Sequence, residues 1–300
     1  MPQLFRYQFL AMGTECSLSL YAGQEAQAEC AAETAMAEVW RIETAYSRYL
    51  DDNLLAAINR AARAGGSIEV DPETAALLDY AAACYRKSDG LFDITSGILR
   101  EAWDFASGLA PPQEKLDALL QRVGFDKLLW ESPRLGFGVP GMELDFGGIG
   151  KEYAADRVAD ICLALGVTSG LVELGGDIRV LGPHPDGSLW RIGIRHPRHP
   201  EEAAGTIHVA SGAIATSGDY ERCLELGGRR YCHILNPQNG WPAEGLSSVT
   251  VLGGQCMVAG SLATIAMLKG SAGPDWLVRQ GVAHCWVGSD LDYGGNLEVG

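Results

Sequence analysis

The spacing of apolar residues changes along the chain, and each spacing predicts a kind of element. Between residues 4 and 22 apolar and polar positions alternate with a period of two, broken at Met12-Gly13-Thr14, which predicts a strand pair or one interrupted strand. Residues 24–49 repeat apolar positions every three or four residues, which predicts a helix. Its predicted apolar face comprises Ala28, Ala32, Ala35, Val39, Ile42, Tyr46 and Tyr49.

Local start and stop signals predict three more helices in the middle of the chain. One begins at Asp71-Pro72-Glu73, which combines an N-cap residue with a proline at the first helical position, and ends near Asp89-Gly90. A short helix follows the linker Ala110-Pro111-Pro112. The third follows Gly147-Gly148-Ile149-Gly150 and ends at Gly166. Its predicted apolar face comprises Ala154, Val158, Ile161 and Leu165.

Short strands dominate the second half of the chain. Two of them flank Gly175-Gly176-Asp177 and predict a hairpin or a tight bend. Helices near 257–269 and 275–280 interrupt the later strands. Because strands and helices are segregated rather than strictly alternating, the pattern favours an α+β fold over a doubly wound parallel sheet. The other expected strands are 128–130, 142–146, 190–194, 206–209, 213–216, 231–235 and 248–252.

Composition and charge narrow the class of protein. The chain has 300 residues, 47% hydrophobic and 20% charged, which is enough for one large core or two smaller ones and excludes a disordered or collagen-like chain. With 38 acidic and 23 basic residues the formal charge is −15, so we expect no nucleic-acid partner. We see no apolar run of the roughly 20 residues that a membrane span needs and expect no membrane insertion. The N-terminal residues lack a signal peptide pattern, so we expect a cytoplasmic protein if the chain starts at its natural start.

The eight cysteines are scattered and form no Cys-x-x-Cys pair, which argues against a zinc site or a thioredoxin-like redox motif. Most have apolar neighbours. We therefore expect reduced, buried thiols rather than a disulfide framework.

Glycine-containing clusters, each with a charged or hydroxyl residue, recur along the chain. Glycine lets a backbone approach a ligand closely and offer its N–H groups. A single cluster is typical of an ordinary turn, but six in one chain favour a ligand held by several loops. The clusters are Met12-Gly13-Thr14, Gly90-Leu91-Phe92-Asp93, Asp145-Phe146-Gly147-Gly148-Ile149-Gly150-Lys151, Glu173-Leu174-Gly175-Gly176-Asp177, Thr216-Ser217-Gly218-Asp219-Tyr220 and His233-Ile234-Leu235-Asn236-Pro237-Gln238-Asn239-Gly240.

The order and spacing of these clusters resemble the ApbE family of FAD:protein FMN transferases over residues 5–290, together with Ser47-Arg48-Tyr49, Asn59 and Trp103. The resemblance implies one α+β domain over 5–290, made of two intertwined lobes with mostly antiparallel sheets and the flavin between them, followed by a C-terminal tail over 291–300. It also implies that the protein cleaves FAD, attaches FMN through a phosphoester to a threonine or serine of an acceptor flavoprotein, and releases AMP.

The resemblance further assigns site residues. Those implied to contact FAD are Met12, Tyr49, Leu91, Phe92, Asp93, Lys151, Tyr153 and Ile234. Those implied to act in catalysis are His233, Asp219 and Lys151. The implied magnesium ligands are the carbonyl of Gly150, position 260 and Thr264.

The chemistry of these side chains allows a functional and a structural interpretation for each. Lys151 lies at a helix start, where charge and dipole both suit a phosphate, but it also fits a solvated surface lysine. His233, with an unperturbed pKa near 6.5, suits a base that deprotonates the acceptor hydroxyl, or a structural histidine. Asp219 is an alternative base or a turn cap. Tyr49 fits flavin stacking or core packing, and Asp93 fits ligand binding or an N-cap.

The sequence departs from the family pattern at the metal site. Gly260 stands where the family has a carboxylate, Asn236 replaces a second acid, and Glu152 stands where glycine is usual. Magnesium prefers charged oxygen ligands, so the loss at 260 predicts a weakened site. The alternatives are an FAD-binding or FAD-hydrolysing member that no longer transfers FMN, or a scaffold that keeps only the fold. An acid from elsewhere, such as Glu152 or Asp177, would restore the site.

Overall fold

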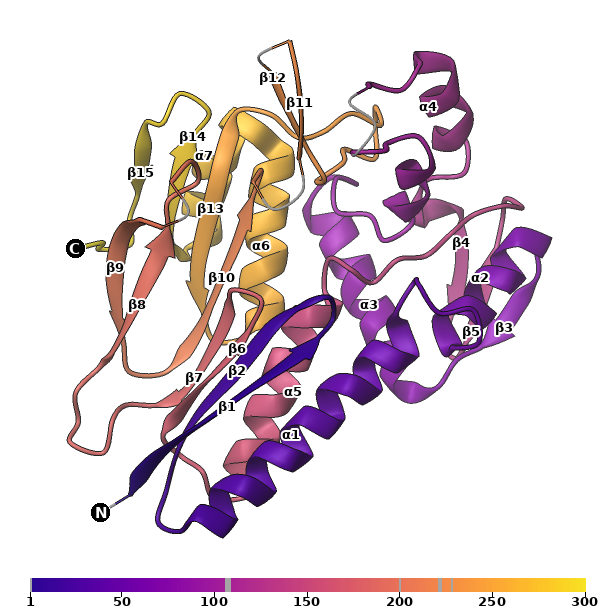
Figure 1. Cartoon of the computed structure of the whole chain (residues 1–300). Coiled ribbons are helices and arrows are strands. Elements are labelled where there is room, and N and C mark those ends of the chain that lie inside the picture. The colour runs from indigo at the N-terminus through magenta and orange to yellow at the C-terminus, as the bar shows by residue number, and fades with distance from the viewer. Residues whose placement is uncertain (1, 106–108, 200, 221–222, 228) are drawn as a thin grey trace.

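The computed structural model describes residues 2–105, 109–199, 201–220, 223–227 and 229–300. In this part of the chain, eight strands form one antiparallel sheet in the order β1-β2-β6-β7-β10-β13-β14-β15 (Figure 1). Short turns join three of its neighbouring strand pairs, β1–β2, β6–β7 and β14–β15, as is typical of antiparallel hairpins. The strands are β1 (Gln3–Ala11), β2 (Thr14–Ala22), β6 (Gly170–Leu174), β7 (Asp177–Gly182), β10 (Gly212–Gly218), β13 (Leu246–Gly253), β14 (Ala283–Gly288) and β15 (Tyr293–Gly295).

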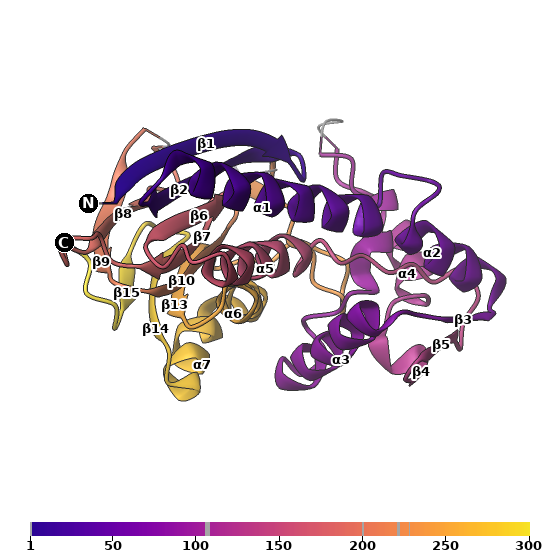
Figure 2. The same cartoon turned by 90° about the horizontal axis from the view of Figure 1, so that it is seen from below.

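Three helices cover one face of this sheet: α1 (Glu25–Tyr46), α5 (Gly150–Ala164) and α6 (Cys256–Lys269) (Figures 1 and 2). The hairpin of β8 (Trp190–Arg195) and β9 (Ala203–Val209) covers the other. Successive residues of β10 therefore face opposite cores: Ala213 and Ala215 pack toward the helices, and Ile214 packs toward the hairpin. The short α7 (Gly273–Gln280) follows α6.

A second lobe is formed by residues between α1 and α5, and α1 reaches from the large sheet to this lobe (Figure 2). It contains a three-stranded sheet in the order β3-β5-β4 beside three helices. Its elements are α2 (Leu54–Ala64), β3 (Ser67–Glu69), α3 (Pro72–Lys87), α4 (Gln113–Leu120), β4 (Leu128–Glu131) and β5 (Arg134–Phe137). A separate hairpin, β11 (Cys223–Leu226) and β12 (Arg229–Cys232), supplies Leu224 to a small core around Trp103 and Leu116.

Most predicted elements are confirmed. The residues that start, turn or end them are the ones that the local sequence pattern indicated. The strand pair β1–β2 turns at Met12-Gly13, where both residues have positive φ. Asp71 caps α3 by accepting hydrogen bonds from the N–H groups of Glu73 and Thr74. The β6–β7 hairpin turns at Gly175-Gly176, again with positive φ, and the mostly antiparallel sheets confirm the α+β class.

One expected helix end and part of one expected helix face are wrong. The first helix ends at Tyr46, so Tyr49 lies beyond it and is 75% exposed rather than packed in the core. The helix after Gly150 stops as expected at Gly166, which has positive φ directly after the C-cap Leu165. Of its predicted apolar face, Ala154 and Val158 are buried, whereas Leu165 is exposed and Ile161 is only partly buried. The buried face comprises Glu152, Ala154, Ala155, Asp156, Val158, Ala159 and Cys162.

The expected strand at 142–146 is absent from the described structure of that segment. The backbone N–H of Leu144 donates to Asn59 Oδ1 at 2.8 Å, and Asn59 Nδ2 donates to the carbonyl of Leu144 at 3.0 Å. A buried side chain on α2 thus satisfies the backbone groups that a neighbouring strand would otherwise pair. Periodicity analysis of the segment alone could not anticipate this partner.

The segment 291–300, expected to be a tail, contributes β15, which pairs with β14 at the edge of the large sheet. The eight cysteines are free, as expected, but Cys30 is exposed rather than buried. The stretch Cys256–Gln280 is long and apolar enough to cross a membrane by length and composition. Within it α6 packs against β10, β13 and α5, and most of its apolar residues belong to the protein core, with Val258 exposed.

Candidate functional site

The start of α5 lies where several distant loops meet. The loop ahead of it, residues 145–149, folds on itself: the carbonyl of Phe146 accepts from Gly150 N–H at 2.7 Å, and Asp145 Oδ1 accepts from Gly147 N–H at 2.8 Å. Arg48 and Arg100 both pair with the buried Asp145. Although burial alone would raise it, these two cations hold the pKa of the Asp145 carboxyl below its usual value.

The β1–β2 turn and the β6–β7 turn adjoin each other beside this loop. Gly175 N–H donates to the carbonyl of Glu15 at 3.2 Å, and a Cβ at Gly175 would lie 2.7 Å from the Thr14 side chain. Asp177, directly after that turn, forms an ion pair with Lys151 in the first turn of α5. Three of the predicted glycine clusters therefore converge at one place.

The backbone around this place is open. A Cβ built on Gly13, Gly150 or Gly176 would meet no described atom within 4 Å, and Gly147 and Gly148 are exposed. Uncovered glycine backbone near a helix N-terminus can approach an anion and direct N–H groups toward it. Lys151 adds a positive charge there, and its side chain remains 30% exposed beside Asp177. The arrangement suits a phosphate or diphosphate.

The Leu91-Phe92-Asp93 segment adjoins the loop through Phe92. A Cβ at Gly148 would lie 3.3 Å from Phe92 Cζ. Asp93 is buried, and its oxygens accept from the N–H and hydroxyl of Thr95, at 2.8 and 2.7 Å, and from the N–H of Phe125, at 3.0 Å. These contacts give Asp93 a structural role in the turn before the short helix Ser96–Glu101, but the N-cap of that helix is Thr95, so the N-cap expected at Asp93 is wrong. Its contact with FAD stays a prediction.

Three other predicted flavin contacts have different surroundings. The N–H of Met12 donates to Glu43 Oε1 at 2.7 Å, which holds the β1–β2 turn against α1. The Tyr153 hydroxyl donates to Glu73 Oε1 at 2.6 Å and so points toward α3. Tyr49 is on the surface. Only Met12 lies in one of the converging turns.

The two predicted bases each come directly after a strand, Asp219 after β10 and His233 after β12. Both carboxylate oxygens of Asp219 accept from Arg198, at 2.6 and 2.8 Å, and Arg198 also donates to Ser247 Oγ. A carboxylate held in this bidentate pair fits a positioning role better than a free base. His233 follows β12 and is half-buried, and the carbonyl of the adjacent Ile234 accepts from Ala243 N–H. The roles of His233 and Ile234 stay predictions.

The implied magnesium site can be tested against the residues present. The described chain holds no cluster of three or more histidine, cysteine, aspartate or glutamate side chains placed to bind a metal ion. However, Glu152 is 8% exposed, and its Oε2 has no hydrogen-bond partner among the described residues. A Cβ at Gly260 would lie 2.8 Å from Glu152 Oε1, and Thr264 Oγ1 lies 2.8 Å from Ser217 Oγ. One carboxylate and hydroxyl oxygens are ligands that magnesium accepts, so the donor set fits.

Sequence reasoning missed several residues of this region: Arg48 and Arg100, which hold Asp145, and Arg198, which holds Asp219. An arginine carries no local signal of a partner that lies 45 or more residues away, as for Asp145. Asp145 itself was part of a predicted cluster.

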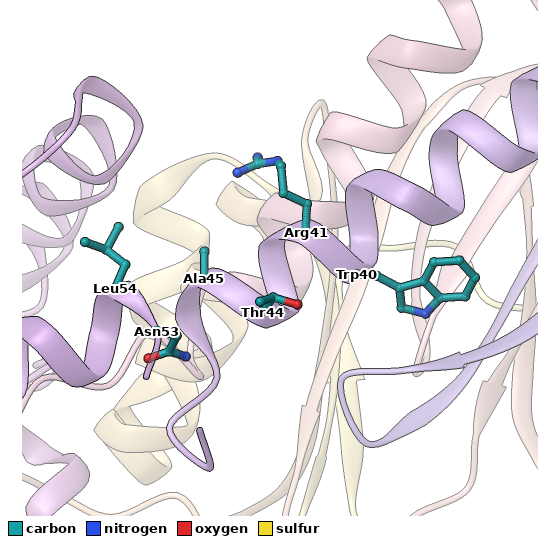
Figure 3. A pocket seen from close by; sticks show the side chains of 6 residues that line it. All are labelled: Trp40, Arg41, Thr44, Ala45, Asn53 and Leu54. Atoms are coloured by element: carbon teal, nitrogen blue, oxygen red, sulfur yellow. The ribbon is translucent and has the colours of Figure 1, made fainter. Parts of the chain in front are cut away.

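A pocket of about 440 Å³ lies elsewhere, on the surface between α1 and α2 (Figure 3). It is lined by Trp40, Arg41, Thr44, Ala45, Asn53 and Leu54. Arg41 already pairs with Glu38 and Glu73, and none of the glycine clusters lines the pocket. It is therefore a poor match for a dinucleotide compared with the start of α5.

Comparisons with known proteins agree with the motif order. The sequence model of the ApbE family matches residues 12–286. A Treponema pallidum protein named FAD:protein FMN transferase is 31% identical over 87% of this chain and 77% of its own length. A Vibrio cholerae protein of the same name is 36% identical, with 61% of this chain and 57% of its own length aligned. The crystal structure of the Thermotoga maritima ApbE protein has a TM-score of 0.89 and 31% identity, covering 98% of this chain and 97% of that one.

Proposed function

This chain belongs to the ApbE family, and on that premise we propose that it is an FAD:protein FMN transferase. It would cleave the diphosphate of FAD and attach the FMN half to a threonine or serine of an acceptor flavoprotein. The observation that carries the proposal is the convergence of three glycine turns with Lys151 at the start of α5. Relatives with this activity in their names support the reaction type.

The residues at the start of α5 would bind and orient the substrate. The exposed backbone of Gly147 and Gly148, together with Lys151, would hold the diphosphate and stabilise charge on its oxygens during cleavage. A bound magnesium ion would supply further neutralisation of the diphosphate. Gly150, Thr264 and Glu152 are the residues here that would hold it.

The transfer balances as a phosphoryl substitution. The acceptor oxygen forms a bond to the FMN phosphorus, the bond from that phosphorus to the bridging oxygen breaks, and AMP leaves with that oxygen. The acceptor hydroxyl proton goes to a base, for which His233 is the candidate. Asp219, held by Arg198, would position neighbouring groups.

The second candidate function is FAD binding or hydrolysis without transfer, which the glycine at position 260 favours because it removes a carboxylate from α6. One experiment separates the two. The protein is incubated with FAD, magnesium and a peptide bearing an acceptor threonine, with a threonine-to-alanine peptide as the control.

Transfer predicts AMP together with a threonine peptide heavier by FMN, and no modified alanine peptide, as read by mass spectrometry. Hydrolysis predicts AMP and free FMN with both peptides. If FAD causes neither a fluorescence change nor a thermal shift at concentrations well above about 1 μM, both functions are wrong.

A further inference from the structure

Two acidic side chains on the buried face of α5 point toward α6, and their surroundings differ. Asp156 accepts hydrogen bonds from the N–H groups of Cys256 and Met257, at 2.8 and 2.9 Å, and from Arg179 Nε at 3.0 Å. Glu152, one helical turn earlier, is equally buried at 8% exposure. Among the described residues, its Oε2 is the one buried carboxylate oxygen without a hydrogen-bond partner. A buried charge without a partner is costly, so this carboxylate calls for an explanation.

The Glu152 carboxylate fills space that a side chain on α6 would otherwise occupy. From the point where a Cβ of residue 260 would stand, Cγ lies 2.7 Å away, Oε1 2.8 Å and the carboxyl carbon 3.1 Å. Gly260 therefore permits the approach of Glu152. The two helices pack directly against each other, so the carboxylate lies at the surface of α6.

Other oxygen atoms lie on the same face of α6. Thr264 is four residues after Gly260, and residues at this spacing are neighbours on a helix surface. Its hydroxyl is 2.8 Å from Ser217 Oγ on β10. The other acids nearby are already engaged: Asp177 pairs with Lys151, and Asp156 caps α6. Glu152 is thus the acid in this region with a free oxygen.

We propose that Glu152 supplies, from α5, the carboxylate ligand of a divalent cation that Thr264 also binds, in the position where α6 carries glycine. The inference deepens the proposed function, on which it rests for the role of the cation beside the diphosphate. Magnesium and manganese are hard cations that take carboxylate and hydroxyl oxygens, so either ion suits the site. Gly260 is then a complement to Glu152 rather than the loss of a ligand.

The test measures cation binding directly on the full chain. Free Mn²⁺ is followed by electron paramagnetic resonance during titration, with and without FAD. Glu152→Gln keeps the shape and removes the charge, and we expect it to weaken Mn²⁺ binding by about tenfold or more. Glu143→Gln is the matched control, because Glu143 is a partly buried carboxylate that pairs with Arg48 in the second lobe. It should bind Mn²⁺ within about twofold of the original chain.

A reciprocal variant tests the placement. Glu152→Gly combined with Gly260→Asp moves the carboxylate from α5 to α6 and should recover binding to within about threefold of the original chain. A double variant that folds but binds Mn²⁺ as weakly as Glu152→Gln would show that carboxylates at positions 152 and 260 do not reach the same cation. If the double variant does not fold, Glu152→Gln alone decides.

Two results overturn the inference outright: Glu152→Gln that binds Mn²⁺ like the original chain, or an original chain that binds none at about 1 mM with or without FAD. Failure of the proposed function looks different. If Glu152→Gln weakens Mn²⁺ binding but the original chain transfers no FMN, the cation site is supported and the proposed function is wrong. If the original chain transfers FMN and Glu152→Gln binds Mn²⁺ with unchanged affinity, the proposed function is supported and the cation site at Glu152 is wrong.

Discussion

The first and second turns of α5 carry two carboxylates with the same burial and opposite surroundings. Asp156 has three donors within 3.0 Å and joins α5, α6 and β7. Glu152 faces the same helix, and one of its oxygens has no partner in the described chain. Burial raises the pKa of both carboxyl groups. The difference teaches that two acids with equal burial can have unequal support: donors from three groups make Asp156 structural, and the unpartnered oxygen of Glu152 is the basis for the ligand role proposed for it.

The largest expected effect is the difference in the free energy of unfolding between variants that lack one or the other of these two carboxylates. Asp156→Ala leaves two N–H groups of α6 and Arg179 without their acceptor, so we expect the free energy of unfolding to fall by about 3 kcal/mol. Glu152→Gln, measured without metal, should change it by less than about 0.5 kcal/mol or raise it, because a costly buried charge is removed. Urea unfolding measures both. Equal losses would mean that both acids are structural.

Asp145 extends the comparison to a carboxylate with cationic partners. Asp145→Asn should lower the free energy of unfolding by about 2 kcal/mol at neutral pH, because Arg48 and Arg100 lose their shared partner. Since the folded-state pKa of Asp145 lies below its usual value, this stabilisation is present above that usual value and is lost as the pH falls through the folded-state pKa. The difference between the original chain and Asp145→Asn should therefore shrink below about pH 4. A constant difference down to acid pH would contradict the ion pairs.

A substitution at Lys151, in the same turn of α5 as Glu152, tests the binding of the ligand rather than the stability of the protein. Lys151→Ala should weaken FAD binding by about tenfold or more, equivalent to about 1.4 kcal/mol, because the charge beside the diphosphate is lost. Riboflavin has no phosphate, so its binding should change by less than about twofold. Fluorescence titration of the two ligands gives both values. Equal losses would argue against a phosphate role for Lys151.

The smallest expected effect is the difference in stability between alanine substitutions at two helical glycines, Gly150 in α5 and Gly260 in α6. A Cβ at Gly150 meets open space, whereas a Cβ at Gly260 would lie 2.7 Å from Glu152 Cγ. Gly150→Ala should leave the free energy of unfolding within about 0.5 kcal/mol, and Gly260→Ala should be less stable than Gly150→Ala by about 1 kcal/mol. Thermal unfolding of both variants is the measurement. Equal stability would show that Glu152 moves aside without cost.

Local patterns were sufficient for most elements of the fold. The alternation in β1 and β2, the cap at Asp71 and the glycine turn at 175–176 are properties of neighbouring residues, and the structure confirms each of them. The strand expected at 142–146 was wrong because its backbone partner is the Asn59 side chain, 85 residues away from Leu144. The role of Asp93 stayed open in the sequence because capping and ligand contact draw on the same residue type.

The sequence by itself determined that glycine turns bearing polar residues occur in the order of the ApbE family, and that position 260 lacks an acid. Only the tertiary structure decided which acid stands next to Gly260, since Glu152 and Asp156 look alike on one helix face. The physical reason is that hydrogen-bond donors come from other elements: the start of α6 and Arg179 on β7 reach Asp156, and no described donor reaches Glu152 Oε2. Periodicity shows which face is buried, but only packing shows what that face meets.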